Sequence, residues 1–411
     1  MRPTWPARAP QQAGTEESPT TALLPIVKPL HVAIASTTLL LAGMAVLGGW
    51  MAHKAAHMGK HAALQQTTSS HLQPSVPGQD SRFYANNPRA MRLAERIAER
   101  SGLDLAWLQK IIGTARISEP IRQLVLPPRK TGARPQRKNW NAYRARFVEP
   151  VRIRAGVKFR DEHREALQRA QKQFGVPAEI IVGVLGMETL WGKQTGQIRV
   201  LDALVTLAVD FPSAHPRAAQ RAAYFAEELE YFLRLMHDSG TDPREPRGSY
   251  AGDMGLPQFM PSSWARFGVD FNGDGHIDLW NAEDAIGSVA NYLLGKGWLA
   301  DQPVYYPAQM DASEAVAAPL TATGLAPLHS VDKLRSLGIT LMTSPDNAPS
   351  SDVQLALVEL ENRDQPSLWI AATGNLRTLT RYNPSRYYAM AVTELGAAIA
   401  AAPALGTEQP D

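Results

Sequence analysis

The 411-residue chain contains no cysteine. This absence excludes disulfides, thiolate metal sites and a lipid attached to an N-terminal cysteine. The sequence also lacks a glycine-rich phosphate loop, a G-x-S-x-G serine elbow and, outside the stretch 53–61, a histidine pair at metal-ligand spacing. Nucleotide hydrolysis, serine esterase chemistry and zinc hydrolysis are therefore disfavoured, and no organic cofactor is expected.

Charge is missing from one long stretch near the N-terminus. Residues 30–52 hold no charged side chain and few polar ones. At about 1.5 Å per helical residue, such a run can cross a hydrocarbon core about 30 Å thick. We predict a single-pass signal anchor at 30–52, preceded by a cytoplasmic tail at 1–29. Residues 53–84 are rich in His, Gln, Ser and Thr and are predicted to form a flexible linker.

Acidic residues are scarce in the segment from Arg122 to Arg160, where Glu149 is the only acid among many Arg and Lys residues. Such a stretch favours an anionic partner. No nucleic-acid-binding module accompanies it, so nucleic acid is not the expected partner. Anionic lipid, a carboxylate-bearing wall polymer or simple exposure of a basic loop to solvent would each explain it.

The rest of the chain predicts an α+β protein that is mainly helical. Apolar periodicity and capping residues predict helices at 89–100, 104–112, 161–174, 178–191, 217–237, 262–267, 282–294 and 387–400. Short β-branched and apolar runs predict strands at 304–306, 353–360, 368–372 and 376–380. A small β-rich subdomain is expected at about 303–375, and a C-terminal tail at 401–411.

Glu188 follows an almost wholly apolar run, residues 180–187, in a helix opened by Pro177. Ile181, Val184 and Leu185 share its helical face, so we expect the acid to point with the apolar side chains. Burial favours the neutral form of a carboxyl group, and a neutral carboxylic acid can serve as a general acid. The alternative is a buried structural glutamate neutralised by an arginine or a backbone donor.

The segment 270–284 has the spacing of an EF-hand calcium loop. Its expected ligands are Asp270, Asn272, Asp274 and the backbone carbonyl of His276. The bidentate glutamate of such loops is replaced by Asn281, and Asp284 could supply the missing oxygen from the following helix. A structural Ca²⁺ ion is predicted, and an Asx-rich turn without metal is the alternative.

Two further segments combine polar and aromatic groups. The glycine-rich stretch 248–262 offers Ser249 and Gln258 among apolar side chains, which suits the edges and faces of a sugar but also an ordinary connector. The second is Arg381-Tyr382-Asn383, followed by Tyr387-Tyr388, at a predicted strand–helix junction. A helix cap with core aromatics would explain it equally well.

Taken in order, these segments resemble the membrane-bound lytic murein transglycosylase B family over roughly residues 85–400. The matching segments are Gly186–Gly192, Arg199–Leu204, Gly248–Ser263, Asp270–Ala290 and Arg381–Val392. The resemblance implies a lysozyme-like core with a flanking helical subdomain, a small β-rich subdomain and an EF-hand-like calcium loop. Leu256 and Pro257 depart from the pattern, because relatives often have tyrosine and glycine there.

The resemblance also implies residue roles. Glu188 would be the catalytic acid and base, and Asp284 the displaced last calcium ligand. The residues implied to bind the saccharide are Tyr143, Ser249, Gln258, Tyr382 and Asn383.

The expected reaction cleaves the β-1,4 bond between N-acetylmuramic acid and N-acetylglucosamine and leaves a 1,6-anhydromuramoyl end. A hydrolytic muramidase and an inactive glycan-binding scaffold on the same fold remain alternatives. The expected partners are peptidoglycan glycan strands and the inner membrane, with the catalytic domain in the periplasm. The sequence does not identify any protein of wall synthesis or division as a partner.

Overall fold

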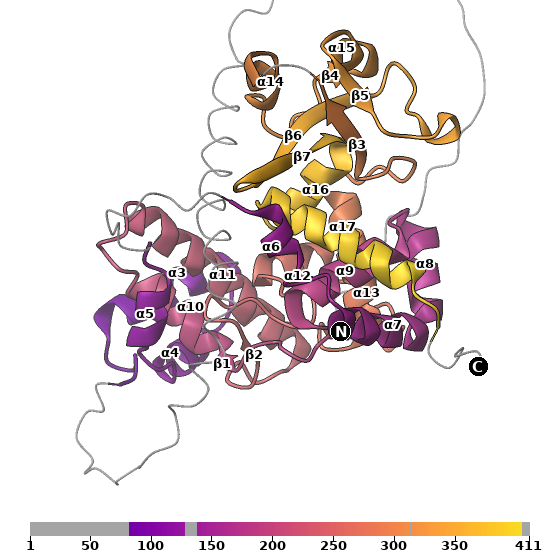
Figure 1. The fold of residues 1–411 in the computed structure, drawn as a ribbon. Coiled ribbons are helices and arrows are strands. Elements are labelled where there is room, and N and C mark those ends of the chain that lie inside the picture. Colours follow the sequence, from indigo (N-terminus) through magenta and orange to yellow (C-terminus); the bar gives the residue numbers. More distant parts are fainter. Residues whose placement is uncertain (1–81, 128–137, 312–313, 405–411) are drawn as a thin grey trace, which may run out of the picture. The chain divides into compact units, whose positions relative to one another are not determined.

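The computed structural model describes residues 82–127, 138–311 and 314–404 (Figure 1). The predicted tail, the predicted anchor at 30–52 and nearly all of the predicted linker lie outside these residues. Within them, no helix is both long and apolar enough to cross a membrane. Tyr84, at the end of the predicted linker, belongs to the fold: its ring is buried and its hydroxyl donates to Asp210 at 2.7 Å.

One group of helices is built from local capping signals and apolar faces. It consists of α3 (Pro88–Ser101), α4 (Leu105–Gly113), α5 (Glu119–Leu124), α10 (Val200–Val209) and α11 (Ala218–Ser239). The side chain of Asn87 caps α3, and that of Asp104 caps α4. Gly102 ends α3 with a φ of 73°, a left-handed conformation that glycine adopts without strain. A short antiparallel ribbon of β1 (Ile198–Arg199) and β2 (Arg247–Gly248) adjoins α10.

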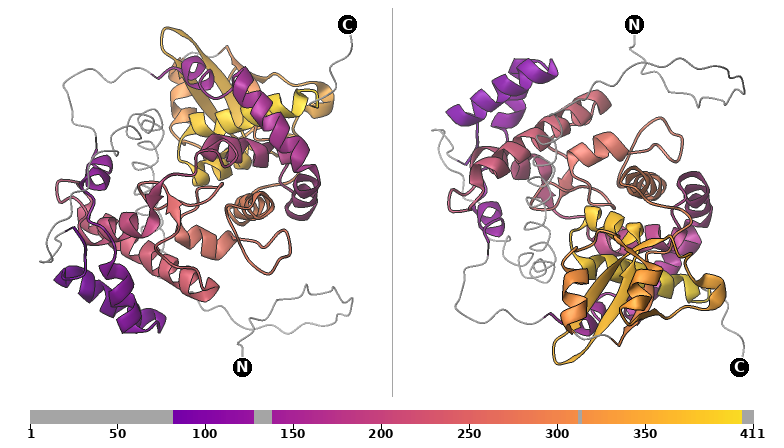
Figure 2. Two further views of the ribbon diagram at one scale, coloured as in Figure 1. Left: turned by 90° about the horizontal axis from the view of Figure 1, so that it is seen from below. Right: turned by 90° about the horizontal axis from the view of Figure 1, so that it is seen from above.

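A second group surrounds the helix that ends in Glu188. Its members are α6 (Trp140–Arg144), α7 (Pro150–Glu162), α8 (Arg164–Phe174), α9 (Ala178–Thr189), α12 (Pro261–Phe267), α13 (Ala282–Gly295), α16 (Gly374–Tyr382) and α17 (Arg386–Ala401). Helix α9 packs against α7, α8, α13 and α17. In both views of Figure 2, the yellow C-terminal helices lie beside the orange sheet, and α16 contacts β7.

The contact between α9 and α17 requires glycine. A Cβ atom on Gly183 would lie 2.3 Å from the carbonyl oxygen of Val392. A Cβ atom on Gly396 would lie 2.1 Å from the carbonyl oxygen of Glu179. Because these obstacles are backbone atoms, no side-chain movement would relieve them. The two helices therefore approach more closely than larger residues would permit.

The β-rich part is a five-stranded antiparallel sheet with the order β4-β6-β7-β3-β5. Its strands are β3 (Tyr305–Met310), β4 (His329–Ser330), β5 (Ile339–Leu341), β6 (Gln354–Asn362) and β7 (Gln365–Ala372). Alternate residues of β6 face opposite sides: Leu355 and Leu357 pack with α14 (Glu314–Thr321) and α15 (Val331–Ser336), whereas Ala356 and Val358 join the main core. Both faces of the sheet are thus apolar: α14 and α15 cover one, and the main core covers the other. A 3₁₀ turn occupies Pro345–Asn347.

The predicted helices and strands are confirmed except at one segment. Residues 376–380, predicted to be a strand, lie in helix α16, so that prediction is wrong. Thr373 caps this helix, and Leu376 and Leu379 are buried at helical spacing. The hydroxyl of Thr378 donates to the carbonyl of Gly374, which lets a residue that often favours strands sit inside a helix. The Arg381–Asn383 junction therefore joins two helices. The sequence indicated no helix at α5, α6, α7, α10, α14 or α15 and no strand at β1, β2, β4 or β5.

Candidate active site

Glu188 lies in the last turn of α9 and is only half-buried. Residues 180–187 are all buried, because neighbouring helices surround α9 on every side. Helical periodicity therefore did not distinguish one face of α9 from another. The expectation that Glu188 points with a buried apolar stripe is wrong, since its side chain emerges where the buried helix ends.

The chain turns sharply directly after the acid. Leu190 and Trp191 both have a φ of 53°, a left-handed conformation that costs non-glycine residues about 1–2 kcal/mol each. The indole N–H of Trp191 donates to the carbonyl of Val182 at 3.0 Å, and its ring packs over Gly186. The hydroxyl of Thr189 donates to the carbonyl of Leu256 at 2.9 Å. These contacts fix the turn and hold it against the glycine-rich loop.

Tyr388, from helix α17, contacts the acid directly. Its hydroxyl donates to Oε1 of Glu188 at 2.7 Å. Sequence analysis noted Tyr388 beside the 381–383 segment but assigned it no role. Its position two residues into the last helix gave no sign of this contact, because the two residues are 200 positions apart in the chain.

Other tyrosines gather around the same carboxyl group. They are Tyr143 of α6, Tyr292 of α13 and Tyr382 of α16, together with Tyr388. Burial raises the pKa of each of these phenols, and the negative charge of Glu188 raises it further. The phenols therefore remain protonated and able to donate hydrogen bonds across the physiological pH range. The Tyr143 phenol is thus within electrostatic range of Glu188.

Tyr143 is half-buried and belongs to an aromatic group. Its ring stacks on Trp140 at a centroid distance of 6.3 Å and meets Tyr387 edge-on at 5.6 Å. Phe147 lies 5.0 Å away on the next turn of the chain. Flat rings of this kind suit the apolar faces of sugars as well as protein packing.

Tyr382 and Asn383 differ in whether their polar side-chain group already has a hydrogen-bond partner in the structure. The Tyr382 hydroxyl donates to the carbonyl of Pro257, and its ring is buried against Phe259 and Tyr292. Its polar group is therefore already used within the protein. The side-chain oxygen of Asn383 is buried and has no hydrogen-bond partner in the structure. An unpaired buried acceptor is costly, which marks Asn383 as a candidate ligand contact.

Ser249 and Gln258 shape the loop that contains them. The Ser249 hydroxyl donates to the Asp253 carboxyl group and accepts the N–H of Ala251 at 3.0 Å. Gln258 has a φ of 52°, and its Nε2 donates to the carbonyls of Thr195 at 3.0 Å and Gly255 at 3.1 Å. Both side chains are 9% exposed. Both lie in one loop, and much of their hydrogen bonding holds that loop in place.

Two further carboxyl groups lie near this loop, but both are closed off. Asp253 and Glu228 are each 3% exposed. Glu228 accepts hydrogen bonds from the N–H of Ser262 at 2.8 Å and from its hydroxyl at 2.7 Å. A two-carboxylate glycosidase needs both groups beside the sugar bond. Neither Asp253 nor Glu228 is open enough to serve as the second group.

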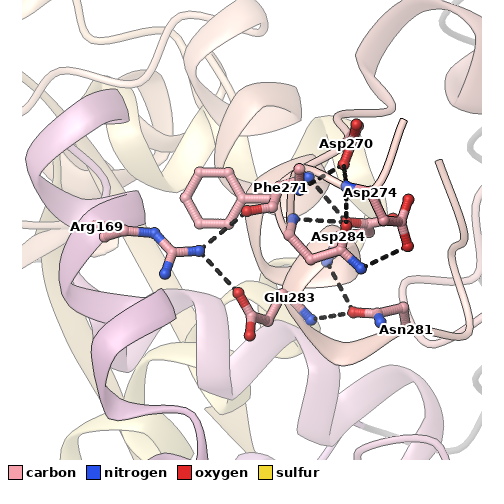
Figure 3. Close-up of polar contacts among 9 residues, drawn as sticks. Arg169, Asp270, Phe271, Asp274, Asn281, Glu283 and Asp284 are labelled. Atoms are coloured by element: carbon pink, nitrogen blue, oxygen red, sulfur yellow. Dashed lines mark hydrogen bonds and ion pairs between the residues drawn. The ribbon is translucent and has the colours of Figure 1, made fainter. Parts of the chain in front are cut away.

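The predicted calcium loop is held in shape by hydrogen bonds from main-chain N–H groups to carboxyl groups of the same segment (Figure 3). The two oxygens of Asp270 accept the N–H groups of Gly273 at 2.7 Å and Gly275 at 2.8 Å. Asp284 is fully buried, and its two oxygens accept the N–H groups of Phe271 and Asp278, each at 2.8 Å. Asp284 therefore closes the loop from the first turn of α13.

The donor set of this loop consists of oxygen atoms from carboxyl, amide and main-chain carbonyl groups. Hard oxygen donors on a glycine-containing loop fit Ca²⁺ and do not fit zinc or copper. In the part of the chain that the structure describes, no three acidic or histidine side chains stand close enough together to hold a metal as they are placed. Arg169 braces the loop from outside by donating to Phe271 and Glu283 (Figure 3).

Several arginines of the basic stretch are used inside the fold. Arg152 donates to the carbonyl of Gly186 at 2.8 Å, and Arg160 donates to that of Ile399 at 2.6 Å. Arg144 forms an ion pair with Glu394 of α17. These side chains anchor α6, α7, α9 and α17 to one another. Part of the stretch is thus explained by structure and not by an anionic partner.

Two surface hollows of the described residues do not contain Glu188. A hollow of about 650 Å³ lies between α7, α8 and the chain end near Ala404. A second hollow, of about 420 Å³, lies between α6, the β6–β7 hairpin and α17. We therefore define the candidate site by the contacts of Glu188 and not by cavity size.

Comparison with known proteins gives consistent results. Residues 85–397 match the transglycosylase SLT domain family. The chain is 39% identical over 323 residues to membrane-bound lytic murein transglycosylase B of Escherichia coli (strain K12), with 78% of this chain and 84% of that protein covered.

Solved structures agree with this match. The fold is similar to that of the Escherichia coli lytic transglycosylase Slt35 in complex with calcium, with a TM-score of 0.65 and 36% identity, covering 80% of this chain and 98% of that one. It is also similar to SltB3 from Pseudomonas aeruginosa in complex with NAG-anhNAM-pentapeptide. That match has a TM-score of 0.62 and 25% identity and covers 76% of this chain and 78% of that one.

Proposed function

The chain belongs to the transglycosylase SLT domain family and is a lytic murein transglycosylase, and from this premise we propose that Glu188 is its single catalytic acid and base. The enzyme acts on peptidoglycan, cleaving the β-1,4 bond between N-acetylmuramic acid and N-acetylglucosamine and leaving a 1,6-anhydromuramoyl product. One observation supports the role of Glu188 above the others. It is half-buried and held by Tyr388, whereas Asp253 and Glu228 are closed to a substrate.

The proposed reaction begins with proton donation by Glu188 to the oxygen of the bond that breaks. The N-acetyl group of the muramoyl residue stabilises the positive charge that develops on its ring. The Glu188 carboxylate then accepts the proton of the muramoyl 6-hydroxyl, and that oxygen bonds to the anomeric carbon. Because the nucleophile sits on the same sugar, the step is unimolecular and consumes no water.

Tyr388 has a clear part in this cycle. Its hydroxyl donates to the carboxyl oxygen that carries negative charge between the two proton transfers. A hydrogen bond to a charged group is worth about 1.5–3 kcal/mol and also fixes the orientation of the carboxyl plane. Tyr388 therefore acts as a positioning residue for Glu188.

The test is a Glu188→Gln variant incubated with purified sacculi. The variant should fold and bind glycan, and its turnover should fall by at least about 10³-fold because the amide cannot transfer the proton. Mass spectrometry of the soluble products reports anhydromuropeptides directly. Full activity of the variant contradicts the proposal. Reducing ends with ¹⁸O from labelled water would indicate a hydrolysing muramidase, and no product from the wild type would indicate a scaffold.

The saccharide contacts are part of the same proposal. Tyr143, with its half-buried ring beside Glu188, is suited to contact a sugar face. The unpaired oxygen of Asn383 is suited to accept an N–H group of an acetamido sugar. Ser249, Gln258 and Tyr382 hold the loop and the helix end that border the cleft.

A structural calcium ion is proposed for the 270–284 loop. Its ligands would be Asp270, Asn272, Asp274, the carbonyl of His276 and Asp284. When bound, the ion supplies positive charge that offsets the repulsion among these acids and ties the loop to α13. The relative Slt35 was solved with calcium, which supports this assignment.

We also propose that the enzyme works in the periplasm and is held to the inner membrane by residues 30–52. The support is the charge-free run in the sequence and the membrane-bound description of the Escherichia coli relative. A linker of about 30 flexible residues has a root-mean-square reach of about 30 Å, which would allow the domain to work on nearby wall.

A further inference from the structure

Four arginines gather beside the loop that carries Ser249. They are Arg116, Arg199, Arg244 and Arg247, called here the arginine patch. In the β1–β2 ribbon, Arg199 stands directly opposite Arg247. Directly opposed residues in antiparallel strands have Cβ atoms about 5 Å apart, and like charges in such a pair repel. The fold therefore keeps an arrangement that destabilises it.

The charges of the patch act on one another. Burial lowers the pKa of Arg199, and the positive charges of Arg116, Arg247 and Arg244 lower it further. Asp202 acts in the opposite direction. The guanidinium groups of Arg116, Arg244 and Arg247 thus lie close enough to Arg199 for their charges to influence it.

Acidic residues compensate only part of this charge. Asp202 accepts the N–H of Arg116 at 2.9 Å and lies 3.5 Å from Nη1 of Arg199. Asp242 is committed to an ion pair with Arg244. Arg116 and Arg247 are exposed and, within the residues that the structure describes, form no ion pair with an acid. Arg247 donates only to main-chain carbonyls, and Arg116 lies over the ring of Phe83.

The patch is joined to the proposed active site through the backbone. Gly248 of β2 directly precedes Ser249, and the carbonyl of Thr195, just before β1, accepts the side-chain amide of Gln258. A Cβ atom on Gly196 would lie 2.1 Å from the carbonyl oxygen of Gly248, so the two backbone segments are in close contact here. Figure 1 shows the ribbon beside α10, to which β1 is packed. Arg247 therefore lies next to the loop that carries Ser249, and Arg116 adds its charge from beside Asp202.

We propose that the arginine patch binds carboxylate groups of the peptide that a peptidoglycan strand carries. This inference rests on the proposed function. The sugars of the strand are neutral, so its negative charge lies on the peptide carboxylates. Guanidinium groups pair with carboxylates through two parallel hydrogen bonds, which gives both strength and orientation. The relative SltB3 was crystallised with a product that bears a pentapeptide.

The test compares two substrates and three proteins. The substrates are intact peptide-bearing strands and stripped strands, from which an amidase has removed the peptides and whose freed lactyl carboxyl groups have been converted to amides. The proteins are the wild type, the double variant Arg116→Gln/Arg247→Gln and the control Arg335→Gln. Arg335 lies on α15, is 72% exposed and is paired with Asp332. The control substitution therefore removes one surface charge away from the patch. Melting curves establish that all three fold.

With peptide-bearing strands, the double variant should show a KM raised about tenfold at low salt, with kcat retained, because two charged contacts are lost. The effect should shrink as salt is added. With stripped strands, the double variant should have the same KM as the wild type. The control Arg335→Gln should have the wild-type KM on both substrates. An equal loss on both substrates, or no loss on either, overturns the inference.

Two other results have separate meanings. If the variants lose affinity for phosphatidylglycerol vesicles while their substrate preference is unchanged, the patch serves a membrane surface and the inference is wrong. If the wild type releases no anhydromuropeptide from either substrate, the proposed function itself fails. A wild type that cleaves both substrates equally well leaves the function intact and contradicts only the peptide contact.

Discussion

At the scale of single residues, the proposed chemistry depends on the contact between Glu188 and Tyr388. The acid comes from the end of α9 and the phenol from the start of α17. Glu188 also influences the pKa of Tyr143, Tyr292 and Tyr382. The Tyr292 and Tyr382 hydroxyls donate to main-chain carbonyls, and the Tyr388 hydroxyl donates to Glu188 itself.

Replacing Tyr388 by phenylalanine should lower kcat by about ten- to hundredfold, because one hydrogen bond to the charged carboxyl is lost. The ring remains, so KM and the melting temperature should change little. Steady-state kinetics on soluble glycan strands with product analysis measures the effect.

The matched control is Tyr306→Phe, a partly exposed tyrosine of β3 in the sheet. It should retain wild-type kcat. If Tyr388→Phe does the same, the Glu188–Tyr388 contact has no part in the reaction.

At the scale of helices, the site depends on how closely α9 and α17 approach. Gly183 and Gly396 make this approach possible, since any Cβ at either position would meet a carbonyl oxygen of the other helix. The helices carry Glu188 and Tyr388, so the separation of the two backbones sets the distance between acid and phenol. Gly183 and Gly396 thus contribute to the proposed site through packing.

A Gly183→Ala substitution should destabilise the fold by about 1–3 kcal/mol, because the added methyl group overpacks a rigid backbone contact. It should also lower kcat at temperatures where the protein is folded, since α17 must move away from α9. Chemical denaturation and kinetics on the same preparation measure both effects. Wild-type stability together with wild-type kcat would show that the two helices can separate freely.

The calcium loop gives a second prediction at this scale. Removing calcium with EDTA should lower the melting temperature by several degrees, because an ion that binds only the folded state stabilises it by mass action. Turnover measured well below the melting temperature should change less. Restoring calcium, but not magnesium, should restore the melting curve.

The matched variants are Asp274→Ala in the loop and Asp332→Ala on α15, where the carboxyl group is 67% exposed. Asp274→Ala should lose the calcium-dependent shift, and Asp332→Ala should keep it. A wild-type melting curve that EDTA does not alter contradicts an occupied site.

At the scale of the described fold, buried carboxyl groups link stability to pH. Burial raises the pKa of Glu228 above its ordinary value of 4.5, although hydrogen bonds from Ser262 act in the opposite direction. The folded protein therefore binds this proton more tightly than the unfolded chain does. The resulting stabilisation is complete below the unfolded pKa and is lost as the pH rises through the folded pKa.

A Glu228→Gln variant carries no such proton. As the pH rises from about 4 to about 7, its free energy of unfolding should therefore increase relative to that of the wild type. Denaturation curves at several pH values measure the difference between the two proteins. A constant difference over this range would show that the folded and unfolded chains bind the Glu228 proton equally.

Local sequence was sufficient for much of the fold. Asn87 caps α3 and Asp104 caps α4 through backbone groups two or three residues away, so local sequence is enough to place the starts of these helices. The loop at 270–284 was recognised because its oxygens are spaced along one short segment. Residues 376–380 were misread because the threonines suggested a strand, whereas burial of Leu376 and Leu379 against other elements favours a helix.

The sequence by itself indicated Glu188 as the candidate acid, the loop at 270–284 as a source of oxygen donors and where most helices begin, since each depends on neighbours within a few residues. Only the tertiary structure decided that Glu188 is half-exposed, that Tyr388 contacts it from 200 residues away and that Arg199 faces Arg247. The physical reason is that α9 is apolar on every side, so its periodicity does not specify which partner covers each face. That choice is made by close packing, and here by the glycines that admit α17.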